Sequence, residues 1–233
     1  MTRDDQPNAA NATSRPSAER APFFSAHRRS HALRLGIAVM LLGLSALPLR
    51  RRGVTDIESD VFYAINSLPD FLFWPIWAVM QLGNIVAVPV VAAVMLMLRR
   101  VRLAIDVAVA GSAAWLLATV IKSIVARARP GEILSDVILR SAPVSGHGYV
   151  SGHAAVAAAM AAVITPYVSR RWKIALWSLA IMVGLARVYV GAHLPLDVVG
   201  GAVMGWAIGS LVHFLLGEPE RTLLRPIGAR EPS

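Results

Sequence analysis

Residues 194–216 read LPLDVVGGAVMGWAIGSLVHFLL and carry one charged residue, Asp197. A helix needs about 20 apolar residues to cross the hydrocarbon core of a bilayer. Pro195 suits the first turn of a helix, where its missing N–H costs no hydrogen bond. This stretch therefore predicts a membrane-spanning helix that carries Asp197 near its start.

The composition of the whole chain also indicates a membrane protein. Of its 233 residues, 56% are hydrophobic and 16% are charged, and the mean hydropathy is +0.57. The formal net charge of +9 would indicate a nucleic-acid partner in a soluble protein. Here the basic residues flank apolar stretches, where they orient membrane helices, so we expect no nucleic-acid partner. The absence of cysteine excludes disulfides, thiolate nucleophiles and cysteine metal sites.

Five further apolar stretches lie before residues 194–216 in the chain. We therefore expect an all-α, polytopic membrane protein with six transmembrane helices in one domain, residues 32–216. One stretch is too long for a single straight span, and Gly83-Asn84 interrupts it. The six predicted spans are Ala32–Leu49, Phe71–Leu98, Leu103–Ile121, Ser151–Val168, Ile174–Tyr189 and Leu194–Leu216.

Polar segments lie outside and between these spans. Residues 1–31 are predicted to be a disordered cytoplasmic tail, because they lack the apolar core of a cleavable signal peptide. Residues 217–233 form a second polar tail. Between the first two spans, Asp56–Asn66 is predicted to be an amphipathic helix at the membrane surface, since Ile57, Val61 and Ile65 recur four residues apart.

Basic residues predict the orientation of the spans. With six spans, four basic clusters lie on one side, which should be cytoplasmic, together with both termini. We therefore expect a multi-pass protein of the cell (inner or plasma) membrane. A fifth cluster, Arg50–Arg52, lies on the opposite side, where contact with anionic head groups is its sole explanation. The four concordant clusters are Arg28, Arg29 and Arg34; Arg99, Arg100 and Arg102; Arg170, Arg171 and Lys173; and Arg221 and Arg225.

Three cations are predicted to lie at one membrane level on the extracytoplasmic side. Lys122, Arg129 and Arg187 would repel each other unless an anion sat among them. A phosphate fits, because guanidinium groups match its oxygens and an ammonium adds a point charge. Ser151 and Gly152 begin a predicted helix, where backbone N–H groups also bind anions. These five residues are the predicted phosphate-binding set.

Two histidines and an aspartate complete the predicted site. His193 and Asp197 are four residues apart, so on a helix they would share one face. Asp197 would then orient the His193 imidazole and leave its other nitrogen as a nucleophile. His153, on the far side of the phosphate, would donate a proton to the leaving oxygen.

These motifs carry a resemblance to a known family. Lys122-x6-Arg129-Pro130, Ser151-Gly152-His153 and Arg187-x5-His193-x3-Asp197 follow in order. The chain resembles the type 2 phosphatidic acid phosphatase family, which includes undecaprenyl-diphosphate phosphatases. The resemblance implies a phosphohistidine on His193, protonation by His153, and hydrolysis of a lipid phosphate without a metal or other cofactor. Its pattern usually has proline where Val150 stands and serine where Ala186 stands.

Several residues fit more than one interpretation. A second Ser-Gly-His string, at residues 145–147, runs into further loop, so Ser151-Gly152-His153 is preferred. Arg127 lies outside the motif spacing and fits either phosphate binding or an exposed head-group contact. His193 with Asp197 also resembles a metal-binding pair, but three neighbouring cations disfavour a divalent ion.

Two other functions remain open. The protein could be a non-catalytic component that binds or transports lipid phosphates, although binding alone needs only the cations. It could also be a phosphotransferase that passes the phosphoryl group from histidine to an alcohol. Phosphatidate, phosphatidylglycerol phosphate and polyprenyl phosphate or diphosphate all fit a site at the membrane surface. The sequence sets neither the substrate nor the oligomeric state.

Overall fold

The computed structural model describes residues 23–46 and 54–217. Most of the predicted tails, residues 1–22 and 218–233, and the Arg50–Arg52 cluster lie outside the described residues.

All regular secondary structure in the described ranges is helical, which confirms the predicted all-α class. The helix predicted between the first two spans, Asp56–Asn66, is observed with these same bounds. The helices are α1 (Phe23–Ala46), α2 (Asp56–Asn66), α3 (Phe73–Met80), α4 (Ala87–Met97), α5 (Val101–Val125), α6 (Pro130–Ile133), α7 (Gly152–Ile164), α8 (Arg170–Tyr189) and α9 (Pro195–Leu216).

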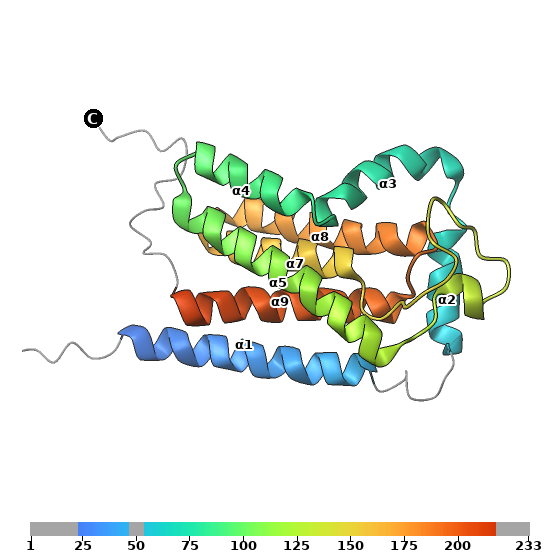
Figure 1. The fold of residues 1–233 in the computed structure, drawn as a ribbon, viewed down its shortest axis with the longest axis horizontal. Coiled ribbons are helices and arrows are strands. Elements are labelled where there is room, and N and C mark those ends of the chain that lie inside the picture. The colour runs from blue at the N-terminus through green and yellow to red at the C-terminus, as the bar shows by residue number, and fades with distance from the viewer. Residues whose placement is uncertain (1–22, 47–53, 218–233) are drawn as a thin grey trace, which may run out of the picture.

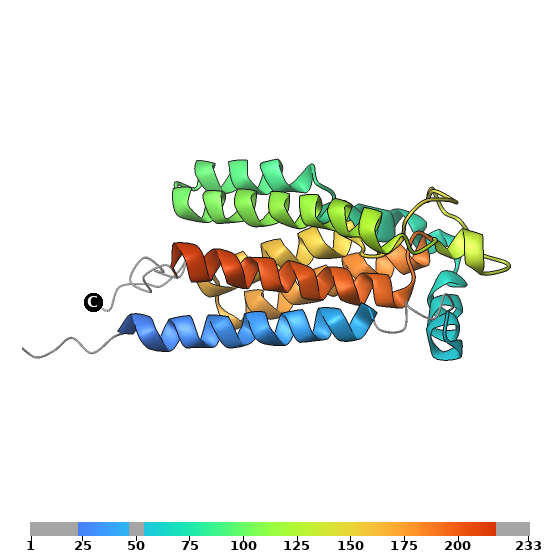
Figure 2. The same ribbon diagram turned by 60° about the horizontal axis from the view of Figure 1, so that its bottom comes forward.

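The long helices form a bundle, and one short helix closes its end. Figure 1 shows α1, α5, α8 and α9 running along the long axis, with α2 standing across one end beside the loop that joins α5 to α7. Figure 2, turned by 60°, shows α1 lying against α9 and α7 enclosed by the other helices. The bundle therefore has a capped end, at α2, and an end where α9 finishes.

Within residues 23–46 and 54–217, three helices, α5, α8 and α9, are long and apolar enough to cross a membrane. The segments Asp70–Gly83 and Ala87–Met97 meet this criterion together, but they are bent by 70°. The bend falls at the predicted Gly83-Asn84 interruption. Two shorter apolar helices, Leu33–Leu44 and Gly152–Tyr167, correspond to the remaining predicted spans. The helix α1 begins at Phe23, nine residues before the predicted span and inside the predicted tail.

The central helix α7 is buried along nearly its whole length because its residues are small. Its sequence, GHAAVAAAMAAVI, lets other helices approach closely. On α9, a Cβ added to Gly201 would collide with the Ser151 carbonyl, and one added to Gly205 would collide with the Ala155 carbonyl. The glycines of α9 thus allow the backbones of α7 and α9 to touch, and this contact sets the start of α7 beside the start of α9.

The helix α2 exposes one face and buries another. Thr55 caps its start by accepting a hydrogen bond from the Glu58 N–H at 3.3 Å. Ile57 and Val61, on the predicted apolar face, are exposed. Glu58, Phe62 and Asn66 face inward and are buried. A buried glutamate at this position was not predicted from the sequence.

Candidate active site

The first two cations lie near the end of α5: Lys122 is in its last turn, and Arg129 follows shortly after it. Ala126 takes a left-handed conformation (φ 48°) and its N–H bonds to the Lys122 carbonyl at 3.0 Å, which ends the helix. The chain then turns so that Arg129 precedes Pro130, the first residue of α6. The Arg129 guanidinium donates to the Ala192 carbonyl at 3.0 Å. This bond ties the first motif to the turn that carries His193.

The second motif lies at the start of α7, as predicted. Ser151 is the N-cap residue and Gly152 the first helical residue. A Cβ added to Gly152 would lie 4.0 Å from Lys122 Nζ, so the lysine ammonium reaches the beginning of α7. The Ser151 N–H is not free for an anion, because it donates to the Asp197 carbonyl at 2.8 Å. That part of the predicted phosphate contact is therefore wrong, and the Ser151 hydroxyl remains.

The third motif lies on the turn between α8 and α9. Gly191 has a positive φ of 77°, and a Cβ there would lie 2.8 Å from the Ile138 carbonyl, so the turn requires glycine. The helix α9 begins at Pro195, after His193. His193 and Asp197 therefore do not share a helix face. Instead, the Asp197 carboxylate folds back and accepts the Leu194 N–H at 2.9 Å.

This arrangement brings the Asp197 carboxylate close to His193. Its Oδ2 atom lies 3.7 Å from His193 Nδ1, which is longer than a hydrogen bond. The interaction in this structure is therefore electrostatic, and a small movement of the imidazole would complete the bond. Both side chains are buried, at 2% and 0% exposure.

His153 and Arg187 join the same group of side chains. The charges of Arg187 and Lys122, together with the His193 imidazole, all act on the His153 imidazole. Arg187 is mostly buried near the end of α8, where its Nη1 lies 3.2 Å from the Met80 sulfur. The structure therefore brings together the three predicted cations, both histidines and Asp197.

Four buried polar atoms in this group have no hydrogen-bond partner, although buried polar atoms are normally paired. Two of these atoms, on Arg129 and Arg187, can only donate, and the Ser151 hydroxyl and the His193 imidazole nitrogen can each donate or accept. The two arginine nitrogens and the hydroxyl suit an anion rich in oxygen atoms, whereas His193 Nδ1 faces the Asp197 carboxylate. The four atoms are Arg129 Nε, Ser151 Oγ, Arg187 Nε and His193 Nδ1.

The surroundings keep His193 neutral near pH 7. The pKa of His193 is lowered to about 4, chiefly by burial and also by the charges of Arg187 and Lys122, while Asp197 opposes them. Burial also lowers the pKa of Arg129, against the attraction of Asp197 and Glu132. Arginine nevertheless stays protonated in proteins. The site thus combines an uncharged imidazole with permanent positive charge.

Arg127 has neither of the roles considered for it. Its side chain is 8% exposed and lies between two carboxylates, Glu58 and Asp197. Burial opposes its charge, but the hydrogen bonds and attraction of Glu58 and Asp197 raise its pKa overall. Arg127 is thus an internal ion-pair partner, and Glu58 is a residue that the sequence analysis missed. The spacing of apolar residues on α2 gave no sign that Glu58 faces inward.

Two further residues fasten the α5–α7 loop to α2. The Asn66 side chain donates to the Ile138 and Tyr189 carbonyls and accepts from the Ile138 N–H, each at 2.9 Å. Arg140 donates to the Asn66, Leu68 and Tyr189 carbonyls and to Asp70. The loop is therefore held in place at the capped end, beside the site.

His147, in the alternative Ser-Gly-His string, is exposed and pairs with Ala128 in an isolated bridge. Its string does not begin a helix. Among the described residues, no group of three or more His, Asp or Glu side chains is placed to share a metal ion.

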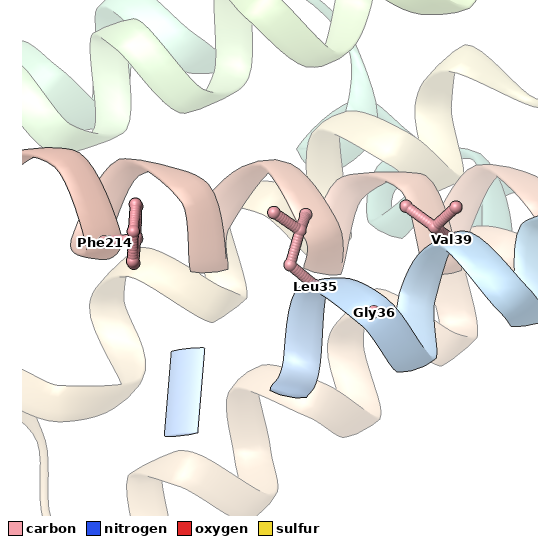
Figure 3. Close-up of a pocket in the computed structure, with 4 residues that line it drawn as sticks. All are labelled: Leu35, Gly36, Val39 and Phe214. Carbon is pink, nitrogen blue, oxygen red and sulfur yellow. The ribbon is translucent and has the colours of Figure 1, made fainter. Parts of the chain in front are cut away.

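An apolar pocket of about 330 Å³ lies between α1 and α9, away from the site. Figure 3 shows its lining residues, Leu35, Gly36, Val39 and Phe214. Phe214 lies in the last turn of α9, whereas Asp197 lies in the first, so the pocket and the site are roughly 25 Å apart along this helix.

Comparison with known proteins identifies the motifs. The PAP2 superfamily sequence model matches residues 103–219. The undecaprenyl-diphosphatase of Sulfolobus acidocaldarius is 32% identical over 139 residues, which cover 58% of this chain and 64% of that protein. The lipid A 1-phosphatase of Rhizobium johnstonii is 36% identical over 94 residues, or 39% of this chain and 38% of that protein. The matches thus span less than two thirds of these curated relatives.

Two solved structures share the fold. Aquifex aeolicus LpxE superposes with a TM-score of 0.63 and 24% identity, over 68% of this chain and 95% of that one. A transmembrane PAP2-type phosphatidylglycerolphosphate phosphatase from Bacillus subtilis superposes with a TM-score of 0.59 and 22% identity, over 84% and 98%.

Proposed function

Because the chain belongs to the PAP2 superfamily, we propose that it is a membrane phosphatase that hydrolyses a phosphomonoester or diphosphate of a lipid. One observation carries this proposal. The four unpartnered buried atoms lie on Arg129, Ser151, Arg187 and His193, which are the residues that the family motifs assign to phosphate and to the nucleophile. A protein that binds only uncharged lipids would not need the buried positive charge around these atoms.

The proposed reaction has two steps. In the first, a His193 nitrogen attacks phosphorus, an N–P bond forms, and the P–O bond to the lipid breaks. His153 gives its proton to the departing oxygen. In the second, water attacks the phosphohistidine and neutral His153 accepts a proton from it. Inorganic phosphate leaves, and both histidines regain their starting states.

The cations act on the charge that develops on the phosphoryl oxygens. Lys122, Arg129 and Arg187, with the Ser151 hydroxyl and the Gly152 N–H, are proposed to hold these oxygens throughout. Such donors are most effective where water is excluded and their positions are fixed in advance. His153 must be protonated in the first step. A bound phosphate dianion offsets the repulsion between His153 and the three cations and so favours its protonated form.

The substrate is proposed to reach the site from the outer leaflet of the cell membrane. In this topology α1, the bent α3–α4 pair, α5, α7, α8 and α9 make six spans, and both termini are cytoplasmic. Contacts at the bundle end where α9 finishes support this topology. Arg102, in the first turn of α5, donates to the Leu216 carbonyl there, and Tyr167, before α8, bonds to Asp106. The basic residues in the first turns of α5 and α8 thus lie at the end opposite the site, as the positive-inside rule requires.

The named relatives act on undecaprenyl diphosphate and lipid A, so we propose these two lipids as substrates alongside phosphatidate and phosphatidylglycerol phosphate. The test is phosphate release by the detergent-solubilised protein with EDTA present. We expect at least one of the four lipids to be hydrolysed by the wild type and by a His147→Ala control, and none by His193→Ala.

The other outcomes point elsewhere. Release that persists in His193→Ala would show that another residue is the nucleophile. Phosphate that appears on an added alcohol instead of in water would indicate a phosphotransferase. No turnover of any lipid by folded wild-type protein would refute the proposed hydrolysis of these substrates.

A further inference from the structure

Arg127 joins two carboxylates from distant parts of the chain. Its two terminal nitrogens meet both Glu58 oxygens, Nη1 with Oε1 at 3.1 Å and Nη2 with Oε2 at 2.7 Å. Nη1 also donates to Asp197 Oδ1 at 2.8 Å. Two-point contacts of this kind fix the plane of a guanidinium group. Glu58 thereby determines how Arg127 presents itself to Asp197.

The three side chains are withdrawn from solvent. Glu58 and Arg127 are 3% and 8% exposed, and Asp197 is fully buried. A buried ion pair costs much to desolvate, and removal of one partner leaves an uncompensated charge. A stable fold does not require this arrangement, because an apolar replacement of similar volume often serves equally well. Its position beside His193 points to a role at the site.

Glu58 also reaches the helix that bears Asp197. Its Oε1 atom accepts the Leu196 N–H at 3.1 Å, one of the N–H groups at the start of α9 that have no partner within the helix. One carboxylate from α2 therefore holds both the guanidinium that contacts Asp197 and the backbone next to Asp197. The Asp197 carboxylate has little freedom left, since its other oxygen accepts the Leu194 N–H.

The charges of the three groups determine what His193 experiences. Arg127 alone would cancel the negative charge of Asp197. With Glu58 present, the group carries two negative charges and one positive charge, so a net charge of −1 faces the imidazole. This charge favours the positive imidazole that forms as the N–P bond is made.

We propose that Glu58 is a positioning residue for the reaction at His193. Through Arg127 it holds the Asp197 carboxylate beside the imidazole and preserves the negative charge of that group. Glu58 itself touches neither the substrate nor the phosphoryl group. This inference rests on the proposed phosphatase function, and it gives the surface helix α2 a part in the chemistry.

The test compares Glu58→Gln with Asp60→Asn. Both changes remove one negative charge from α2, but Asp60 is exposed. With the lipid that the wild type hydrolyses, we expect Glu58→Gln to lower kcat about 10-fold or more while KM changes less than about 3-fold. Asp60→Asn should match the wild type. A loss of folded protein alone would lower the amount of active enzyme but not kcat per active site, measured from phosphohistidine formed in a single turnover.

A double substitution tests whether Glu58 acts through Arg127. In an Arg127→Gln background, Glu58→Gln should change kcat by less than about 2-fold, because the path is already broken. Independent, multiplying effects would overturn the inference, and so would a wild-type kcat in Glu58→Gln. If Glu58→Gln does not fold, Glu58→Asp replaces it. Its shorter carboxylate cannot reach every partner, so a wild-type kcat there would also overturn the inference.

The two proposals fail in different ways. Normal turnover by Glu58→Gln beside an inactive His193→Ala variant refutes only the role of Glu58. A wild-type protein that releases no phosphate refutes the proposed function and, with it, this inference.

Discussion

The Ser151 N–H donates a hydrogen bond to the Asp197 carbonyl at 2.8 Å. This bond joins the N-cap of α7 to the first turn of α9, so the second and third motifs form one rigid unit. The Ser151 side chain is thereby held in the buried interior with its hydroxyl unpaired. The backbone of Ser151 serves the fold, and its side chain is left unpaired, as the proposed phosphate contact requires.

Ser151→Ala should therefore affect activity and spare the fold. The lost hydroxyl makes no internal hydrogen bond, so we expect the unfolding temperature to stay near that of the wild type. The rate should fall about 10-fold to 150-fold, as expected for one hydrogen bond to a charged group worth about 1.5–3 kcal/mol. Steady-state phosphate release and thermal unfolding in the same detergent provide the two measurements. An unchanged rate would show that the hydroxyl does not contact the phosphoryl group.

Gly205→Ala should destabilise the contact between α7 and α9. The added methyl group would meet the Ala155 carbonyl and lie 2.9 Å from the Ala159 backbone nitrogen. Neither atom can move without shifting α7, so we expect a loss of about 1–3 kcal/mol in unfolding free energy. Gly43→Ala in α1 is the matched control, since a Cβ there meets nothing within 4 Å. It should be neutral or stabilise the helix slightly. Equal stabilities of the two variants would argue against the close α7–α9 packing.

The protein should lose stability as the solution is acidified, because burial lowers the pKa of His193 to about 4. In the unfolded chain the same group titrates near 6.5. Between these values the unfolded state binds more protons, so stability falls as the pH drops from about 6.5 to about 4. The full effect corresponds to about 3 kcal/mol. His193→Gln should lack this part of the pH dependence, which thermal unfolding between pH 4 and pH 8 would reveal.

Asn66→Ala should release the α5–α7 loop. The substitution removes three hydrogen bonds of 2.9 Å, two of them to Ile138 in the loop. We expect a loss of about 2–3 kcal/mol and faster amide exchange of the loop, measured by mass spectrometry. Asp60→Ala, on the exposed side of the same helix, should leave the exchange unchanged. Loop exchange that stays slow in Asn66→Ala would mean that Arg140 alone secures the loop.

The sequence was most informative where one segment decides its own structure. Apolar runs predicted the helices, Gly83-Asn84 marked the bend, and the four-residue recurrence of Ile57 and Val61 identified α2. The motif spacings also predicted which residues gather, because three ordered patterns fix the family. Spacing alone misled at His193 and Asp197, since Leu194-Pro195 starts α9 between them and the carboxylate folds back.

Roles that depend on a distant partner were beyond sequence reasoning. Arg127 and Glu58 are 69 residues apart, and neither belongs to a motif. The spacing of apolar residues on α2 predicted a helix, but it did not reveal that Glu58 would point inward. Likewise, the Ser151 N–H seemed available at a helix start, and only the position of α9 shows that it is already bonded.

The four unpartnered atoms at the site have a consequence for turnover. Donors arranged around a phosphoryl group do not distinguish the group in transit from the inorganic phosphate released at the end. Under the proposed topology, phosphate outside the cell should therefore compete with the lipid, and product inhibition would slow the proposed enzyme when phosphate is plentiful. A site open to the exterior would in this way adjust lipid dephosphorylation to the phosphate supply without a separate regulatory domain.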